Sequence, residues 1–260
     1  MLGPRLPAAR VATLSLAGAL GFLVLWIGAA LAGLTSRQFL PTPWDVVVRF
    51  AQLVVEPFAG YTLLQHLLSS FQRFALGFIL AVVVGIPLGL LMAWFRWIDR
   101  IVTPVFDAVR FVAPIAWVPF AALWFGTGIG GPVLIIFVGA FPPVLINTYR
   151  GAKNVDRKYL EAAQMLGASH WRAMTQVLLP AAVPSIVAGL RIAAGLGWQS
   201  LVGAELIVAS SGVGYLMVKG QAAVSTATVM SGMLAIGVVG VLIDSALRRM
   251  QQAIETRRGH

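Results

Sequence analysis

The chain contains 260 residues, of which 59% are hydrophobic and only 11% are charged. Soluble domains carry roughly 25% charged residues, so this composition excludes most soluble fold classes. The net charge of +10 at pH 7 could suggest nucleic acid, but the lysines and arginines fall at the ends of apolar segments and not on one patch. We therefore expect no nucleic-acid partner and take the lipid bilayer as the natural solvent. The absence of cysteine excludes disulfides and thiolate metal sites.

Several apolar segments approach the roughly 20 residues that a helix needs to cross the hydrocarbon core of a membrane. They predict an all-α membrane protein with six transmembrane helices, at residues 12–34, 63–94, 103–125, 132–150, 177–209 and 225–247. The first segment follows two arginines and could imitate a signal peptide, but it is too long for the apolar region of one. We interpret it as an uncleaved first span.

Three connections lie on one side of these spans. Residues 35–62 contain three prolines and two interfacial aromatic residues, Trp44 and Tyr61, which predicts a stiff scaffold or docking surface. Residues 126–131 are glycine-rich and predict a tight turn that makes the third and fourth spans neighbours. Residues 210–225 are apolar and glycine-rich at first, so we expect them to dip back toward the membrane.

Positive charges are distributed unevenly between the two sides. With the N-terminus in the cytoplasm, the opposite side holds only Arg37, Arg49 and Lys219. The cytoplasmic side then holds Arg5, Arg10, Arg96, Arg100, Arg150, Lys153, Arg157, Lys158, Arg172, Arg248, Arg249, Arg257 and Arg258. Since positive charge collects on the cytoplasmic side, both termini are predicted to be cytoplasmic.

The most distinctive polar stretch between spans is residues 154–180, which this topology also places in the cytoplasm. Asp156 is placed to cap a helix, and Gly167 is placed to end it in a left-handed conformation. Ser169 can cap a second helix that leads into the fifth span. Between the first two caps, one helical face collects Tyr159, Ala162, Ala163 and Leu166. A helix that only rests on a membrane surface favours bulky apolar residues, so this small-sided face indicates close packing against a partner protein.

The same stretch carries a family signature. Glu161-Ala162-Ala163, Gly167 and Leu179-Pro180 together resemble the EAA motif of permease subunits of bacterial ATP-binding-cassette (ABC) importers. Further segments look like the nitrate, sulfonate and taurine branch of that family: 85–94, 113–128, 147–156, 189–207 and 212–217. The resemblance covers roughly residues 63–250. One departure is Val112-Ala113, where members of this branch usually carry Arg and Pro, so sulfonate-like specificity is not carried over.

This resemblance implies a type I ABC importer permease fold. Residues 1–62 would form an N-terminal transmembrane helix and a periplasmic connection, and residues 63–260 a permease core containing the EAA loop 154–180. It implies a bacterial inner-membrane complex of two permease copies, two ABC subunits and an extracytoplasmic substrate-binding protein. The residues that it assigns to coupling with the ATPase are Tyr159, Leu160, Glu161, Ala162, Ala163, Leu166 and Gly167.

The chain lacks a GxxxxGK[ST] phosphate loop. ATP and Mg²⁺ are therefore expected on a partner subunit, and the chain itself is expected to be neither an enzyme nor a cofactor-binding protein. The leading hypothesis is a permease that forms the pathway for a small anionic solute. A secondary transporter driven by an ion gradient is the alternative, and it predicts inverted repeats with paired intramembrane carboxylates. A third hypothesis is a membrane scaffold that only recruits the ATPase.

Candidate pathway or gate residues lie within the predicted spans: Trp117, Arg191, Trp198, Gln199, Ser200 and Glu205. A charge such as Glu205 costs about 2.5–3.5 kcal/mol or more in mid-membrane, so it either serves transport or bonds backbone amides of the turn at 210–214. Arg191 has a stem long enough to reach an interface. Trp198, Gln199 and Ser200 follow two glycines that indicate either close helix packing or a water-lined path.

The remaining charged and metal-ligating residues favour structural roles. Asp107 and Arg110 are expected to neutralise each other at three-residue spacing, and Arg73 is expected to face an interface. The three histidines have no partners at ligand spacing, so no metal site is predicted.

Overall fold

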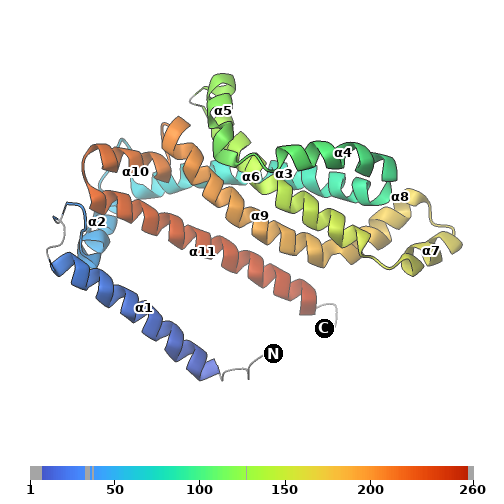
Figure 1. Cartoon of the computed structure of the whole chain (residues 1–260), viewed down its shortest axis with the longest axis horizontal. Helices are drawn as coiled ribbons and strands as arrows, with labels where there is room; N and C mark the ends of the chain where they lie inside the picture. The colour runs from blue at the N-terminus through green and yellow to red at the C-terminus, as the bar shows by residue number, and fades with distance from the viewer. Residues whose placement is uncertain (1–7, 33–35, 37, 127, 257–260) are drawn as a thin grey trace. The chain divides into compact units, whose positions relative to one another are not determined.

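The computed structural model describes residues 8–32, 36, 38–126 and 128–256, and these residues are almost entirely helical (Figure 1). The α-helices are α1 (Ala8–Leu31), α2 (Pro43–Val55), α3 (Leu63–Trp94), α4 (Arg96–Val109), α5 (Val118–Phe125), α6 (Gly130–Lys153), α7 (Arg157–Met165), α8 (His170–Ala173), α9 (Leu179–Val208), α10 (Val213–Ala222) and α11 (Thr226–Thr256). A 3₁₀ turn, η1 (Pro114–Trp117), precedes α5, and a π-helical turn, η2 (Met174–Leu178), joins α8 to α9.

Five helical stretches of the described chain are long and apolar enough to cross a membrane: Thr13–Leu31, Leu63–Trp94, Gly130–Lys153, His170–Val208 and Thr226–Ile254. A bent pair of helices brings the number to six if the pair is one span. The all-α membrane fold predicted from the sequence is therefore confirmed. The fifth span is longer than predicted, because α8, η2 and α9 continue into one another.

The third predicted span, 103–125, is not a continuous helix. The segments Arg96–Val109 and Pro114–Phe125 meet at a bend of 88°. The residue before a proline is sterically driven out of the helical region, and Ala113 before Pro114 has φ −57° and ψ 139°. The sequence prediction treated apolarity as sufficient for a span and gave no weight to this proline.

The connection at residues 35–62 contains a helix that the sequence prediction missed. Pro43 occupies the first position of α2, where its missing N–H costs nothing. The Thr42 hydroxyl accepts a hydrogen bond from the Asp45 amide at 3.2 Å, and the Asp45 carboxylate accepts one from the Thr42 amide at 3.0 Å. This reciprocal pair is a capping box, so Pro43 starts a helix here and does not merely stiffen a loop.

The chain divides into two compact units. The first comprises the chain up to Leu63 together with Leu216–Leu234, and the second comprises Leu64–Tyr215 together with the chain from Ala235 onward. Within the first unit, Arg49 Nε donates to Thr228 Oγ1 at 2.9 Å, and Ser231 Oγ donates to the Val46 carbonyl at 3.1 Å. These bonds fix α2 against the start of α11.

The second unit is organised around α6 and α9, which lie side by side (Figure 1). The neighbourhood that residues 126–131 predicted is confirmed, since α5 and α6 are in contact and Ala121 shares a buried cluster with Ile135. Gly130 and Gly131 already belong to α6, and residue 127 lies outside the described residues. Glycines permit the close approach of α6 to α9. A methyl group on Gly139 would lie 2.2 Å from Ser200 Oγ, and one on Gly189 would lie 2.5 Å from Asn147 Cβ.

This packing makes a paired prediction on one helix. Gly189→Ala is expected to destabilise the protein by about 1–3 kcal/mol, because the added methyl group overpacks the contact with α6. Gly195→Ala is the matched control, since a methyl group there meets nothing within 4 Å, and it should leave stability unchanged or slightly raised. The thermal midpoint of the detergent-purified protein measures both. Equal midpoints for the two variants would contradict the packing argument.

Candidate transport pathway and coupling surface

A cavity of about 860 Å³ opens in the second unit. Its wall comes from α4, η1, α6 and α9 and is built mostly from aliphatic and aromatic side chains. Three of the predicted pathway residues line it, namely Trp117 from η1 and Gln199 and Ser200 from α9. The bend between α4 and η1 contributes to this wall, since residues 112–115 on the bend also line the cavity.

Few polar groups face this cavity. The Ser200 hydroxyl donates to the Leu196 carbonyl at 2.7 Å, so its proton is already used. The indole nitrogen Nε1 of Trp117 is buried and has no hydrogen-bond partner within the described residues. Arg110 also lines the cavity, and Asp107 holds it in an ion pair at 2.8 Å, as the sequence predicted. The cavity wall is thus mostly apolar, and Arg110, Gln199 and Ser200 are the polar side chains that line it besides the Trp117 indole.

Trp198 and Arg191 do not belong to the wall of this cavity. Trp198 is 5% exposed, its indole N–H donates to the Ile236 carbonyl at 3.1 Å, and its ring meets Phe74 edge-on. Arg191 forms two hydrogen bonds with Asp244, at 2.6 and 3.1 Å. The sequence prediction had no partner for Arg191, because Asp244 lies 53 residues away on another helix.

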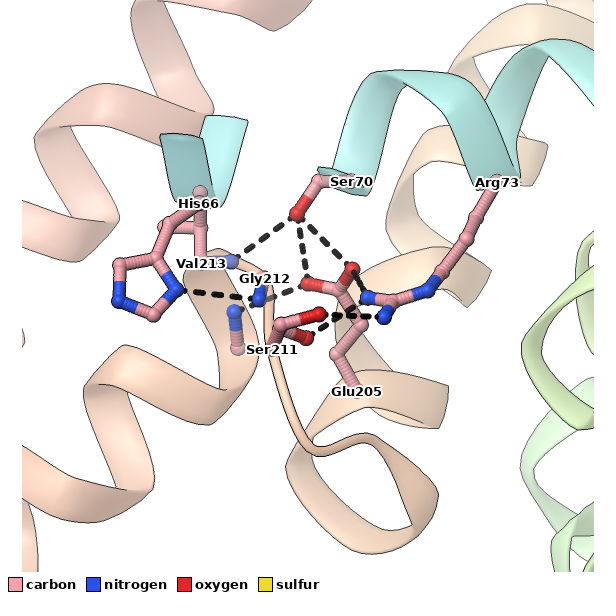
Figure 2. Close-up of polar contacts among 8 residues, drawn as sticks. His66, Ser70, Arg73, Glu205, Ser211, Gly212 and Val213 are labelled. Atoms are coloured by element: carbon pink, nitrogen blue, oxygen red, sulfur yellow. Dashed lines mark hydrogen bonds and ion pairs between the residues drawn. The ribbon is translucent and has the colours of Figure 1, made fainter. Parts of the chain in front are cut away.

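Glu205 lies in a dense polar cluster between α3 and the turn after α9 (Figure 2). Its carboxylate is 1% exposed and accepts hydrogen bonds from the Ser70 hydroxyl at 2.8 Å, from Arg73 Nη1 at 2.8 Å and from the Gly214 amide at 3.0 Å. The sequence allowed two roles for Glu205, and the bond from the Gly214 amide corresponds to the structural one, in which the carboxylate bonds backbone amides of the turn at 210–214. The carboxylate is a fixed acceptor that closes the turn.

The position of Arg73 differs from the one expected from the sequence. It was expected at an interface, but it is 7% exposed and forms an ion pair with Glu205. Its guanidinium also donates to the carbonyl and the hydroxyl of Ser211, at 2.7 and 2.6 Å (Figure 2). A buried cation is stable only with such partners, and no pattern in the sequence joins residues 73 and 205.

Helix α3 also holds the rest of the turn that follows α9. The Gly212 amide donates to His66 Nδ1 at 3.1 Å, and the Val213 amide donates to Ser70 Oγ at 2.9 Å (Figure 2). Gly212 has φ +109°, and a methyl group there would lie 2.2 Å from the Glu205 carboxylate. A sequence signal for this site did exist, because His66, Ser70 and Arg73 recur at spacings of four and three residues and so share one face of α3.

The polar insertion folds as its caps predict. Asp156 precedes α7 and accepts from the Lys158 amide at 3.1 Å, Gly167 has φ +78°, and Ser169 accepts from the Arg172 amide at 3.3 Å. The π-helical turn η2 then leads into α9. The sequence did not predict this turn.

Helix α7 has one anchored side and one open side. Leu160 packs against a buried cluster that includes Ala152 and Met174. In contrast, Tyr159 is 64% exposed and Leu166 is 89% exposed, and no residue of α7 is fully buried. A short, capped helix at the end of α6 (Figure 1) therefore presents large apolar side chains to its surroundings.

No group of three or more histidines, aspartates and glutamates arranged to hold a metal ion occurs among the residues that the structure describes.

The spans, the apolar cavity and the projecting helix α7 together define a helical membrane transport subunit. Residues 85–260 match the family described as binding-protein-dependent transport system inner membrane component. The chain belongs to this family, and it is a permease subunit of an ABC importer.

Curated relatives cover nearly the whole chain. It is 35% identical to the taurine transport system permease protein TauC of Escherichia coli, over 98% of this chain and 93% of that one. It is 35% identical to the putative aliphatic sulfonates transport permease protein SsuC of Bacillus subtilis, over 89% and 83%. It is 32% identical to the bicarbonate transport system permease protein CmpB of Synechococcus elongatus, over 93% and 88%.

A solved structure supports the fold. An inward-facing form of the MetNI methionine ABC transporter superposes with a TM-score of 0.66, covering 74% of this chain and 95% of the matched chain at 19% identity. This likeness confirms the type I importer permease fold that the sequence resemblance implied.

Proposed function

We propose that this chain works as one of two identical permease copies in a bacterial inner membrane, where it imports a small organic anion delivered by an extracytoplasmic binding protein. The observation that carries this proposal is the apolar cavity with Trp117, Gln199 and Ser200 on its wall. Two partner ABC subunits bind ATP and Mg²⁺ and supply the energy. Relatives named for taurine, aliphatic sulfonates and bicarbonate support an anionic solute.

The cavity wall favours an organic anion over a small hydrated one. An anion that enters an apolar cavity loses its hydration, which costs free energy unless donors replace the lost water. The amide of Gln199 and the guanidinium of Arg110, which Asp107 already pairs, offer donors, but the rest of the wall offers mainly apolar contact. A solute with an apolar body and one anionic group can bind the donors through its anionic group and the apolar side chains through its body. Bicarbonate can use only the donors.

The coupling surface is the open side of α7. Tyr159, Glu161, Ala162, Leu166 and Gly167 are all exposed, Ala163 is half-buried, and Leu160 anchors the helix from behind. Exposed apolar side chains on a polar insertion suit a groove on a soluble protein, and we assign that groove to the ATPase. Arg191, Trp198 and Glu205 lie outside the cavity wall, and we assign them to holding the helices that form it.

Orientation follows from charge. Exposed arginines and lysines gather around α7 and the adjoining ends of α4 and α6, and positive charge is retained on the cytoplasmic side. Both termini and α7 are then cytoplasmic, and α2 is on the outer side.

The test is to purify the chain with its partner subunits in lipid nanodiscs and to measure ATP hydrolysis with binding protein loaded with an alkanesulfonate, an aromatic carboxylate, taurine or bicarbonate. A permease subunit predicts hydrolysis that rises with a loaded binding protein. Uptake by liposomes that contain this chain alone would instead support a secondary transporter. ATP hydrolysis that does not change with any loaded binding protein, together with no solute uptake by the liposomes, would support a scaffold and overturn the proposal.

A further inference from the structure

Helix α2 has an exposed apolar stripe that the transport function does not use. Trp44 is 72% exposed, Val47 51% and Val55 77%, and the stripe is completed by Val48 and Ala51. These positions recur at three- and four-residue spacing, so they form one continuous face of the helix. The stripe carries no charged residue.

The other face of α2 is already occupied. Val46 is 4% exposed and Leu53 is 1% exposed. Arg49 turns away from the stripe, because its guanidinium donates to Thr228 and lies 5.4 Å from the centre of the Phe58 ring. Asp45 is part of the capping box at the helix start. The stripe therefore points outward on a helix whose orientation is fixed by its opposite side.

Two contacts within the first unit set the depth of α2 relative to the spans. The indole N–H of Trp26 donates to the Pro41 carbonyl at 3.1 Å, and Trp26 precedes the end of α1 at Leu31 by about 7 Å of helix. On the other side, α2 bonds Thr228 and Ser231 in the first two turns of α11. Both neighbours are membrane spans, so α2 lies level with the last two turns of α1 and the first two turns of α11.

We infer that α2 is an interfacial membrane helix whose stripe, Trp44 to Val55, inserts among the acyl chains of the adjacent leaflet. Amphipathic helices of this kind bury their apolar face about 5–10 Å into the boundary between head groups and chains, which matches the depth set by Trp26. Tryptophan is favoured at that level. Helix α2 also contacts α1, whose own apolar side chains, such as Phe22 and Leu25, are exposed as in a lipid-facing helix.

Lipid fits the stripe better than a protein partner does. A protein interface of this size normally includes hydrogen-bonding or charged groups at its rim. On the stripe and along its edge, α2 offers the indole N–H of Trp44 and the exposed Gln52, whose side-chain oxygen already accepts from Arg49 at 3.3 Å. The stripe is also narrow, a single row along a helix of 13 residues. A second permease copy and a binding protein are the competing occupants.

The lack of any native cysteine makes the test direct. Single cysteines at Val47 and Val55 carry a nitroxide spin label, and the exposed residue Glu56 is the matched control. The full chain, copurified with its partner subunits, is placed in nanodiscs of phosphatidylethanolamine and phosphatidylglycerol. Collision of the label with oxygen, which concentrates in lipid, is compared with collision with a water-soluble nickel chelate.

The expected result is a ratio of oxygen to nickel collisions that is several-fold higher at residues 47 and 55 than at residue 56. A high nickel rate at 47 and 55 would place the stripe in water and overturn the inference. Low rates with both probes would show that a protein covers the stripe and would overturn it equally. The result does not depend on the solute or on ATP, so it stands apart from the proposed transport function.

Discussion

Arg73→Met is expected to lower the free energy of unfolding by about 3–5 kcal/mol, because it leaves the Glu205 carboxylate buried without its cation. Glu205 is 1% exposed, and Arg73 approaches it at 2.8 Å. The turn at Ser211 loses its two hydrogen bonds from Arg73 in the same step. Denaturant titration or the thermal midpoint of the detergent-purified protein measures the loss.

Two further variants test the cause. The double variant Arg73→Met with Glu205→Leu removes both charges and should recover part of the lost stability, because breaking a buried pair costs more than replacing it. Lys158→Met is the matched control, since its ion pair with Asp156 is exposed, and its effect should be below about 1 kcal/mol. If Arg73→Met behaves like the control, the buried pair does not stabilise this fold.

Gly167→Pro is expected to abolish the stimulation of ATP hydrolysis by a solute-loaded binding protein while the spans still insert. Gly167 has φ +78° and its amide donates to the Gln164 carbonyl at 2.9 Å. Proline fixes φ near −65° and has no N–H, so the turn that ends α7 cannot form. The coupling surface then loses its position. ATP hydrolysis by the purified complex in nanodiscs is the measurement.

Asparagine provides the control at the same position, because it tolerates the left-handed conformation better than other residues with a side chain. Gly167→Asn should retain most of the stimulation. Glu161→Lys tests the surface without touching the backbone, and it should also abolish stimulation, because it reverses the charge of an exposed residue on α7. Normal stimulation in both Gly167→Pro and Glu161→Lys would refute the assignment of α7 to the ATPase contact.

Local chemistry made much of this fold predictable. The caps at Asp156, Gly167 and Ser169 were predicted correctly, because each depends on a side chain or φ value within three residues of the helix end. Most spans were located from apolar length alone. Two local signals were nevertheless missed. The proline at 114 breaks the third span, and the capping box at Thr42 and Asp45 begins α2.

The buried cluster was harder to predict, because its partners are far apart in the sequence. Arg73 and Glu205 are 132 residues apart, and Arg191 and Asp244 are 53 apart. A charged residue in an apolar segment indicates that a partner exists, but it does not indicate which one. The cavity likewise depends on how α4, η1, α6 and α9 assemble, and no single segment encodes it.

Helices α8, η2 and α9 follow one another as a single stretch of 39 residues from His170 to Val208. The stretch is not straight: it changes direction along its length (Figure 1), and it contains the π-helical turn η2 and Pro184, two features at which helices kink. One end adjoins the turn that holds α7, and the other end carries Glu205, which the ion pair with Arg73 holds to α3. A displacement of α7 can therefore be absorbed at the bend, while the end of α9 at Glu205 stays fixed to α3.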